Sequence, residues 1–231
     1  MTKLVQGQAS GDTSMRVVVT TAPVRRQVAE HIRSAITSGR FAPGQRLIEK
    51  DLCEMTGVSR PSIREALRQL ETDGLIEVIP HKGPTVARLT REDAAGIYQV
   101  RAALEALAAQ NFAEVASDAD IVRLKQAVAA LKLAYATQDV EQILVAKHTF
   151  YQVLFEGAGN PTISAVLRTL TDRITLLRRV TLSSPQRGAD SLAEIDIILA
   201  AIERRDAPAA HAATLHHISR ASKSALQALD P

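Results

Sequence analysis

Residues 52–74 read LCEMTGVSRPSIREALRQLETDG, and this stretch decides the fold of the N-terminal part of the chain. A short segment ends at Gly57, and a second one begins after Ser59, a residue type that caps helix N-termini. Apolar residues recur on one side of the second segment at helical spacing, at Ile63, Ala66, Leu67 and Leu70. Two helices joined by a glycine turn predict a helix-turn-helix.

Arginines occupy the opposite side of the second predicted helix, at Arg60, Arg64 and Arg68. An arginine near the N-terminal end of such a helix can reach guanine O6 and N7 in the major groove of DNA. The alternative is a charged face that only meets solvent. Arg68 in particular lies further along the helix, where it could simply pair with Glu65 or Glu71.

The residues after this motif predict a β-hairpin. LIEVIP and TVARL have the composition of short strands, and HKG joins them. His81, Lys82 and Gly83 would form a basic tip that can approach the DNA backbone or minor groove closely. Helix, turn, basic helix and basic hairpin in this order indicate a winged DNA-binding domain.

The sequence on either side sets the domain boundaries. Residues 1–21 are rich in Ser, Thr, Gly and Gln without periodicity, and we expect a flexible arm there. A helix is predicted from Val24 until Gly39, followed by a Pro-Gly turn. Residues 22–90 would therefore form the winged helix-turn-helix domain, and residues 91–231 a second, all-helical domain.

The second domain reads as an antiparallel bundle of six helices, so the predicted fold is mainly α. Each segment carries an apolar stripe, and the breaks are marked by capping residues, Gly or Pro. The predicted helices are 92–115, 118–136, 139–157, 160–182, 190–205 and 207–228.

Charge and composition narrow the class of protein. Of 231 residues, 46% are hydrophobic and 3% aromatic, which favours a helical globular protein. Residues 1–90 carry 13 Lys and Arg against 9 Asp and Glu, whereas the remainder carries 15 against 16. The positive excess in the N-terminal part suggests a polyanionic partner, a weak signal that gains weight beside the helix-turn-helix.

Cellular location follows from what the chain lacks. Its one cysteine, Cys53, excludes an internal disulfide and fits a reducing cytosol. No apolar stretch is long enough for a signal peptide or a membrane span. We therefore expect a cytoplasmic protein with no membrane partner.

Two groups of segments resemble a known family. The runs VRRQVAEHIRSAITSGRFAPGQRL and EKDLCEMTGVSRPSIREALRQLETDGLIEVIPHKGPTV resemble the winged helix of GntR-type transcription regulators. VRAALEALAA, TFYQVLFEGAGNP and LAEIDIILAAIERRDAPAAHAATLHHI resemble the helical ligand-sensing (FCD-type) domain of the FadR subfamily. The resemblance covers about residues 23 to 228. It implies a homodimer that reads a palindromic operator in double-stranded DNA and responds to a small molecule, more often as a repressor than as an activator.

The resemblance also assigns DNA contacts. They fall on the second and third helices and the wing, where the matching residues are Lys50, Arg60, Ser62, Arg64, His81, Lys82 and Gly83. We expect Arg60 and Arg64 to read bases. Lys50 and Lys82 would contact phosphates or the groove edge.

Many regulators of this subfamily bind a divalent metal inside the bundle. The resemblance implies an Asp and a His four residues apart, a His after Glu, and a His near the C-terminus. Here those positions hold Lys147, Tyr151, Ile195 and His217. One imidazole holds a metal poorly, and the Lys147 ammonium would repel it. We therefore predict that the chain has no metal cofactor, and we expect His148, His211 and His216 to be solvent histidines.

Lys147 instead suggests an effector site. It lies in a stripe with Ile143, Phe150 and Leu154, where a lysine costs stability unless its charge finds a partner. We hypothesise that its ammonium supplies the positive charge that the metal supplies in relatives. The effector would then be a small anion, most simply a carboxylate.

Other residues would complete this site. Tyr151 and His217 would add hydrogen bonds, and Arg101 and Arg173 match positions where relatives often point polar groups at the cavity. The alternative is that Lys147 extends to solvent and pairs with Glu141 or another surface acid.

Two other functions are weaker. An enzyme is not expected, because the chain has no Gly-rich phosphate loop, nucleophile elbow or paired catalytic carboxylates. The residues after Thr90 are also too few for the aminotransferase-like domain of some GntR proteins. A nonspecific architectural DNA-binding protein would carry more than the net charge of +3 found here.

Overall fold

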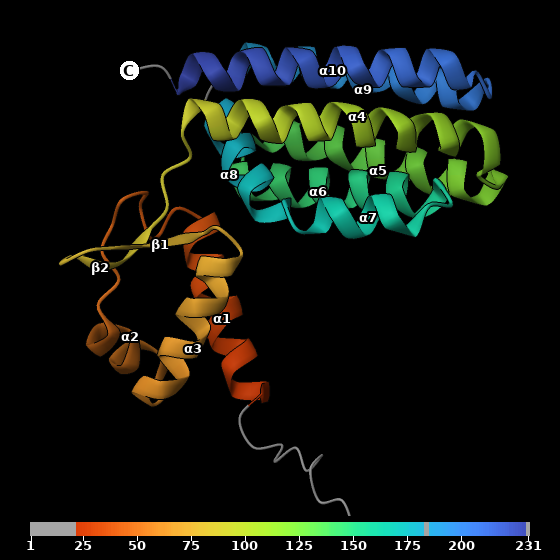
Figure 1. The fold of residues 1–231 in the computed structure, drawn as a ribbon. Helices are drawn as coiled ribbons and strands as arrows, with labels where there is room; N and C mark the ends of the chain where they lie inside the picture. The colour runs from red at the N-terminus through yellow and green to blue at the C-terminus, as the bar shows by residue number, and fades with distance from the viewer. Residues whose placement is uncertain (1–21, 183–184, 230–231) are drawn as a thin grey trace, which may run out of the picture.

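The structure, a computed structural model, describes residues 22–182 and 185–229. Ten helices and one two-stranded sheet are present within these residues. The chain forms two lobes (Figure 1). A small N-terminal lobe contains α1 to α3 and the sheet, and it lies below one end of a longer helical bundle formed by α4 to α10. The fold is mainly α, as predicted. The predicted arm, residues 1–21, lies outside the described residues.

The N-terminal lobe is a winged helix-turn-helix, as predicted. Its elements are α1 (Ala22–Thr37), α2 (Glu49–Thr56), α3 (Arg60–Thr72), β1 (Ile76–Ile79) and β2 (Gly83–Val86). The strands pair antiparallel, with Ile76 opposite Val86 and Ile79 opposite Gly83. Gly57 ends α2 with a φ of 70°, a left-handed conformation that favours glycine.

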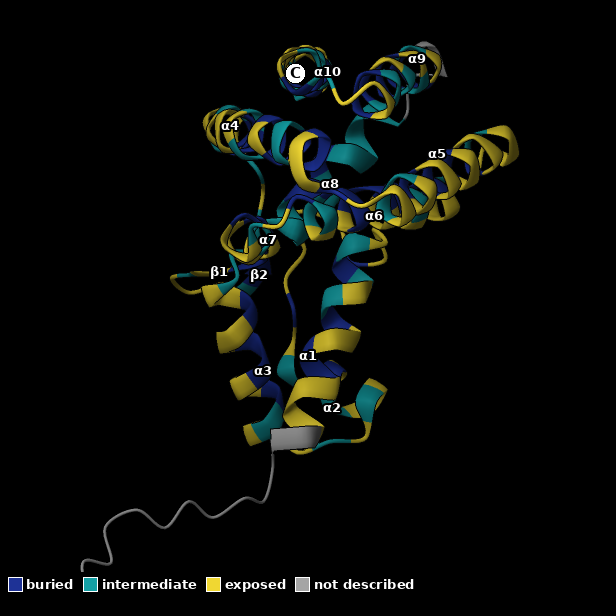
Figure 2. Cartoon of the chain, turned by 90° about the vertical axis from the view of Figure 1, so that its right-hand side faces the viewer, coloured by how far each residue is buried: buried dark blue, intermediate teal, exposed yellow. Residues whose placement is uncertain are grey.

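The core of this lobe lies between α1 and α3, whose buried faces are turned toward each other (Figure 2). The predicted apolar stripe of α3 is buried, together with Val28, Ile32 and Ile36 of α1. One local prediction was wrong. Ser59 occupies the position before α3, but its hydroxyl caps no backbone N–H and lies instead 3.2 Å from Ser62 Oγ.

The C-terminal bundle has seven helices among the described residues instead of the six predicted. They are α4 (Arg91–Val115), α5 (Asp118–Thr137), α6 (Val140–Gly157), α7 (Pro161–Arg168), α8 (Thr171–Thr181), α9 (Pro185–Glu203) and α10 (Ala207–Ala228). The helix predicted over 160–182 is broken at Thr169 and Leu170. Their N–H groups bond to carbonyls three residues back, which tightens the chain into a turn without Gly or Pro.

Helix α9 begins at Pro185, five residues before the predicted start at 190, and the other helix boundaries lie close to the predicted ones. Thr90 with Asp93, and Ser117 with Asp120, form reciprocal capping boxes at the starts of α4 and α5. The side chains of Asp139, Asn160 and Asp206 accept backbone hydrogen bonds at the starts of α6, α7 and α10.

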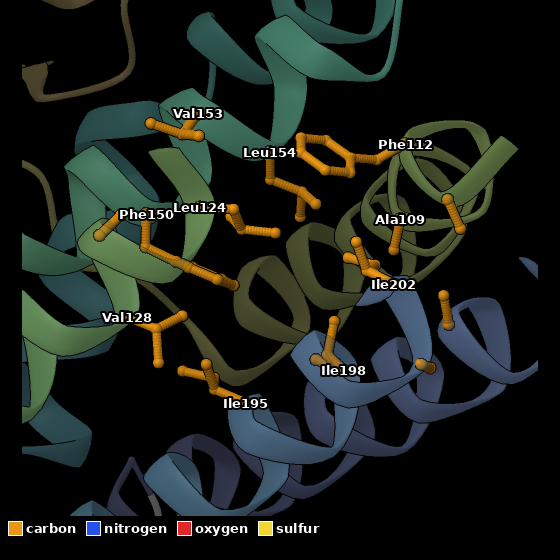
Figure 3. Packing of buried hydrophobic residues seen from close by; sticks show 14 of the residues in the cluster. Ala109, Phe112, Leu124, Val128, Phe150, Val153, Leu154, Ile195, Ile198 and Ile202 are labelled. Carbon is orange, nitrogen blue, oxygen red and sulfur yellow. The ribbon is translucent and has the colours of Figure 1, made fainter. Parts of the chain in front are cut away.

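The largest apolar cluster of the bundle joins α4, α5, α6, α9 and the start of α10. Ile195, Ile198 and Ile202 of α9 point toward Leu124 and Val128 of α5 and toward side chains of α4 and α6 (Figure 3). Gly157 lets α6 approach α4, because a Cβ there would collide with the Phe112 ring.

A smaller apolar cluster of α4, α8 and α10, which includes Ile97 and Leu177, lies nearer the N-terminal lobe. The buried charged side chains of Arg101 and Glu105 lie between the two clusters along α4.

Candidate functional site

The outward face of α3 carries the predicted DNA-reading arginines. Arg60 is exposed at the first position of the helix. Arg64 is also exposed, and its Nε donates to both carboxylate oxygens of Glu49 at 2.9 and 3.0 Å. This contact uses Nε alone, so the two terminal nitrogens of Arg64 can still donate hydrogen bonds to a DNA base.

The neighbouring polar residues differ in what they contact. Arg68 Nη1 donates to Glu65 Oε1 at 2.6 Å, which is the surface pairing that the sequence left open for it. The Lys50 side chain is 71% exposed, with Nζ 3.8 Å from Glu54. Ser62 is half-buried next to Ser59.

The wing tip is held against the lobe. His81 and Gly83 have φ values of 64° and 82°, so both residues adopt left-handed backbone conformations in the turn between the strands. Lys82 Nζ donates to the Gly44 carbonyl at 3.1 Å, which ties the tip to the loop before α2. A shallow groove between α3 and the sheet is lined by residues from both, including Arg64 and Val78. Helix and wing thus form one surface.

Inside the bundle, side chains of six helices converge on a cavity of about 20 Å³. Four of the five residues predicted for an effector site line it, namely Arg101, Lys147, Tyr151 and His217. Sequence reasoning missed Arg178, Arg187 and Ser191, which line the same cavity.

A continuous chain of hydrogen bonds crosses this cluster from α4 to α10. Arg101 Nε donates to Glu105 Oε1 at 2.7 Å, and Arg101 Nη2 lies 3.4 Å from the Tyr151 hydroxyl. The same hydroxyl lies 3.2 Å from His217 Nε2. Burial, then the Glu105 carboxylate, raise the pKa of Tyr151 above its ordinary value, so the phenol keeps its proton and can donate it to His217.

Glu194 completes the chain. His217 Nδ1 lies 2.6 Å from Glu194 Oε2, and both terminal nitrogens of Arg187 donate to the carboxylate at 2.9 and 2.8 Å. Burial opposes the ionised carboxylate, but the hydrogen bonds from His217 and Arg187 outweigh it and lower the pKa of Glu194 to about 2. Burial lowers the pKa of His217 to about 4, so its imidazole is neutral, with the proton on Nδ1.

Lys147 is buried in this cluster, with only 7% of its surface exposed. Its Nζ donates to Ser191 Oγ at 3.1 Å and lies 5.5 Å from the centre of the Tyr135 ring. The alternative in which it reaches solvent is wrong, and Glu141 pairs instead with Arg179 at 2.5 Å. Burial, and then the nearby arginines, lower the pKa of Lys147 well below its ordinary value.

Two arginines face the cavity with hydrogen-bonding capacity to spare. The Arg178 guanidinium stacks on the Tyr151 ring at 4.2 Å, and that of Arg101 lies 4.9 Å from the centre of the Tyr98 ring. Arg101 Nη1 is buried without a hydrogen-bond partner. A buried donor without an acceptor is uncommon in proteins and indicates a missing ligand or water.

The cluster therefore has an excess of positive charge. Three arginines, Arg101, Arg178 and Arg187, surround the cavity beside the Lys147 amine, whose protonated form burial and these arginines disfavour. Two carboxylates are hydrogen-bonded to them, Glu105 to Arg101 and Glu194 to Arg187. An arrangement of this kind can bind a small anion.

Arg173 does not belong to this cluster, contrary to the prediction. Its Nη2 donates to Asp93 Oδ1 at 3.0 Å, and its side chain packs beside Gly74 of the N-terminal lobe. The residue therefore lies at the junction of the two lobes.

Helix α8 connects the cluster with the N-terminal lobe. Besides Arg178 it carries Asp172, which pairs with Arg33 of α1, and Arg179, whose Nε donates to the Thr37 carbonyl at 2.8 Å. Leu176 of the same helix packs against the core of the N-terminal lobe. A displacement of Arg178 would thus reach α1 directly.

The residues present do not fit the divalent metal of the resembling regulators. Ile195 packs in the apolar core against α5 (Figure 3). Lys147 places an amine where a carboxylate would be needed. In the part of the chain that the structure describes, no three His, Cys, Asp or Glu side chains are grouped as metal ligands. His148 and His216 are exposed, and His211 is half-buried.

Comparison with known proteins assigns each of the two lobes to a family. The family described as "Bacterial regulatory proteins, gntR family" matches residues 24–86, and the family described as "FCD domain" matches residues 96–220. None of the helices in the described ranges could span a membrane.

Individual relatives match over most of their length. The uncharacterised HTH-type transcriptional regulator YdhC of Bacillus subtilis is 29% identical over 199 residues, which cover 85% of this chain and 88% of YdhC. The HTH-type transcriptional repressor RspR of Escherichia coli K12 is 24% identical over 207 residues, 90% of this chain and 91% of RspR. A crystal structure of a GntR transcriptional regulator from Rhodococcus sp. RHA1 superposes with a TM-score of 0.79 at 25% identity, covering 89% of this chain and 99% of the other. The chain belongs to the GntR family of bacterial transcription regulators and carries an FCD domain.

Proposed function

We propose that this transcription regulator is a homodimeric repressor of a palindromic operator, and that a small carboxylate bound in the FCD domain controls its DNA affinity. The observation that carries the proposal is the buried cluster around Tyr151, where cations outnumber carboxylates. A buried ammonium without a carboxylate partner costs stability, so a role in binding explains its presence.

The cluster supports a carboxylate in particular. An effector carboxylate beside Tyr151 could accept hydrogen bonds from Lys147 Nζ, from the free Nη1 of Arg101 and from Arg178. Its negative charge would offset the repulsion between the two arginines and would favour the protonated form of Lys147. Binding would therefore favour the arrangement of α4, α6 and α8 that brings them together.

DNA recognition would use the winged domain. Arg60 and the terminal nitrogens of Arg64 would read bases, while Lys50 and the wing residues His81, Lys82 and Gly83 would contact the backbone or groove edge. Two copies would each take one half-site. Since α8 contacts both the cluster and α1, an effector at Arg178 could alter the placement of the two winged domains.

The proposal includes the absence of a metal and a cytoplasmic location at the nucleoid. A metal analysis of the purified protein tests the first point, beside melting curves with and without a chelator. We expect no stoichiometric metal and an unchanged melting temperature. A bound metal, or a large drop on chelation, would overturn this part.

The central experiment joins DNA binding to effector binding. Operator fragments are selected from genomic DNA with the full-length protein, and their affinity is measured by fluorescence anisotropy with a panel of carboxylic acids. We expect at least one acid to weaken operator binding and to raise the melting temperature of the free protein. If an acid strengthens operator binding, the protein is an activator or a co-repressed regulator; if none has any effect, the effector proposal fails.

Variants separate the two sites. Lys147→Met should remove the response to the acid and leave operator binding intact, whereas Arg60→Ala should weaken operator binding and leave the acid-induced stabilisation intact. Lys132→Met is the matched control, because Lys132 is half-exposed and pairs with Asp196 at 2.7 Å on the bundle surface. A normal response in Lys147→Met would contradict the assigned site.

A further inference from the structure

The cavity at Lys147 is too small for a complete metabolite. A cavity holds one water when about 10–15 Å³ is accessible to it. The space among Lys147, Tyr151 and Arg178 is about 20 Å³, and this accommodates little more than one water or part of a carboxylate group. If an acid binds here, its remaining atoms must lie elsewhere.

A second cavity begins where the first one ends. It measures about 230 Å³, lies between α6, α7 and α8, and shares Tyr151 and Arg178 with the inner cavity. The stacked Arg178 and Tyr151 side chains, 4.2 Å apart, therefore form the boundary between the two spaces. No residue of this outer cavity was assigned to the effector from the sequence apart from Tyr151.

The lining of the outer cavity indicates what it can hold. Phe155, Leu167 and Ile174 supply an apolar wall, and Ser164 and Thr171 supply hydroxyl groups. In another protein an apolar cavity of about 150 Å³ holds a benzene ring. The space here is larger, so it accommodates a substituted ring or a branched chain of similar size.

The charges of the outer cavity disfavour a second anionic group. Glu105 and Glu156 both contribute to the lining. Hydrogen bonds from Arg123, at 2.7 Å, and from Gln152 lower the pKa of Glu156, so its carboxylate is ionised. Arg168 and His148 also line the cavity and, like Glu156, they are exposed. A second carboxylate deep in the cavity would meet the buried Glu105 carboxylate.

We propose that the effector is an amphipathic monocarboxylate. Its carboxylate binds among Lys147, Arg101 and Arg178, and its apolar body, with a ring or branched chain, occupies the outer cavity between α6, α7 and α8. This inference rests on the proposed function, because it extends the same effector site.

The test compares acids that differ only in the body. Binding to the full-length protein is measured by isothermal titration and by melting curves with acetate, phenylacetate, 3-phenylpropionate and the dicarboxylate phthalate. We expect the two phenyl monocarboxylates to bind at least tenfold more tightly than acetate and phthalate. Equal binding of acetate, or preferred binding of phthalate, would overturn the proposal.

A cavity-filling variant makes the test specific. Ser164→Phe should weaken binding of the phenyl acids at least tenfold and leave acetate binding unchanged. Ala165→Phe is the control, because Ala165 is exposed on the same helix and does not line the cavity. If Ser164→Phe does not fold, Ser164→Leu replaces it. Unchanged binding of the phenyl acids in the variant that folds would contradict the assignment.

Failure of this inference can be told from failure of the proposed function. If no carboxylate stabilises the protein, both fail. If acetate or phthalate stabilises it and Lys147→Met removes that effect, the carboxylate site stands and only the amphipathic body is wrong.

Discussion

Two arginine–glutamate pairs in this protein have the same chemistry in opposite surroundings. On the DNA-binding surface, Arg64 Nε lies 2.9 Å from Glu49, and the side chains are 59% and 29% exposed. Inside the bundle, Arg101 Nε lies 2.7 Å from Glu105, and the side chains are 2% and 1% exposed. Water can solvate the first pair when it separates, but separation of the second leaves charges in an apolar interior.

This difference in burial suits the two pairs to different tasks. Arg64 can leave Glu49 for a guanine at little cost, because one exposed contact replaces another. Arg101 is fixed by Glu105, and its unpaired Nη1 is therefore held toward the effector cavity. In the proposed function, one residue type would thus serve as a movable reader of DNA and as an immobile part of an anion receptor.

The largest expected effect comes from breaking the buried pair. Glu105→Gln leaves the Arg101 guanidinium buried without its counter-charge, and we expect the free energy of unfolding to fall by about 3–5 kcal/mol. Urea denaturation measures it. The control is Glu65→Gln, which breaks the exposed pair with Arg68 and should cost less than about 1 kcal/mol. Equal losses in the two variants would mean that burial does not distinguish the pairs.

The second largest effect should come from low pH, which lowers the stability of the folded protein through the buried cluster. Burial lowers the pKa of His217 to about 4 from an ordinary 6.5, so between these values the unfolded chain takes up a proton that the folded chain does not. Stability should therefore fall as the pH drops from about 6.5 to 4, by about 3 kcal/mol. Below that, the carboxylate of Glu194, with its pKa of about 2, should add a further loss as the pH falls from about 4.5 toward 2.

His217→Gln isolates the imidazole. The variant should lose the slope between pH 6.5 and 4 in urea denaturation, whereas His216→Gln, at the exposed neighbouring position, should retain it. A retained slope in His217→Gln would assign the pH dependence to another group.

The exposed arginines should matter for DNA binding but not for stability. We expect Arg60→Ala to weaken operator binding about ten- to hundredfold and to relax the sequence preference at one base pair of each half-site. Lys50→Ala should weaken binding to all sequences alike and reduce the slope of log affinity against log salt by about 1. Anisotropy titrations at several salt concentrations distinguish the two outcomes. If Arg60→Ala weakened binding to all DNA sequences equally, Arg60 would not read a base.

The sequence predicted the winged domain well because its signals are local. Helical spacing in α3, the glycine at position 57 and the basic hairpin each specify structure within a few residues. The effector cluster was predicted in part, since Arg101, Lys147, Tyr151 and His217 lie where the resemblance placed them.

The missed residues depend on tertiary packing. Arg173 and Arg178 are both in α8 and lie about 140° apart around the helix, so only its orientation decides which one faces the cavity. That orientation follows the break at Thr169 and Leu170, which no Gly or Pro marks. Arg187 and Glu194 are seven residues apart, two turns of one helix, and this spacing could have identified them as a pair.

The smallest effect should come from the exposed pair itself. Glu49→Gln removes the negative charge that Arg64 pairs with, and because both side chains are solvated, we expect an unchanged melting temperature. Operator affinity should rise a few-fold at low salt for two reasons. Arg64 no longer has to break an ion pair before it contacts DNA, and a negative charge near the phosphates is removed. The gain should shrink as added salt screens that charge. A loss of affinity would instead show that Glu49 orients Arg64 for the base, as Glu105 orients Arg101, and the exposed pair would then resemble the buried one more closely than its solvation suggests.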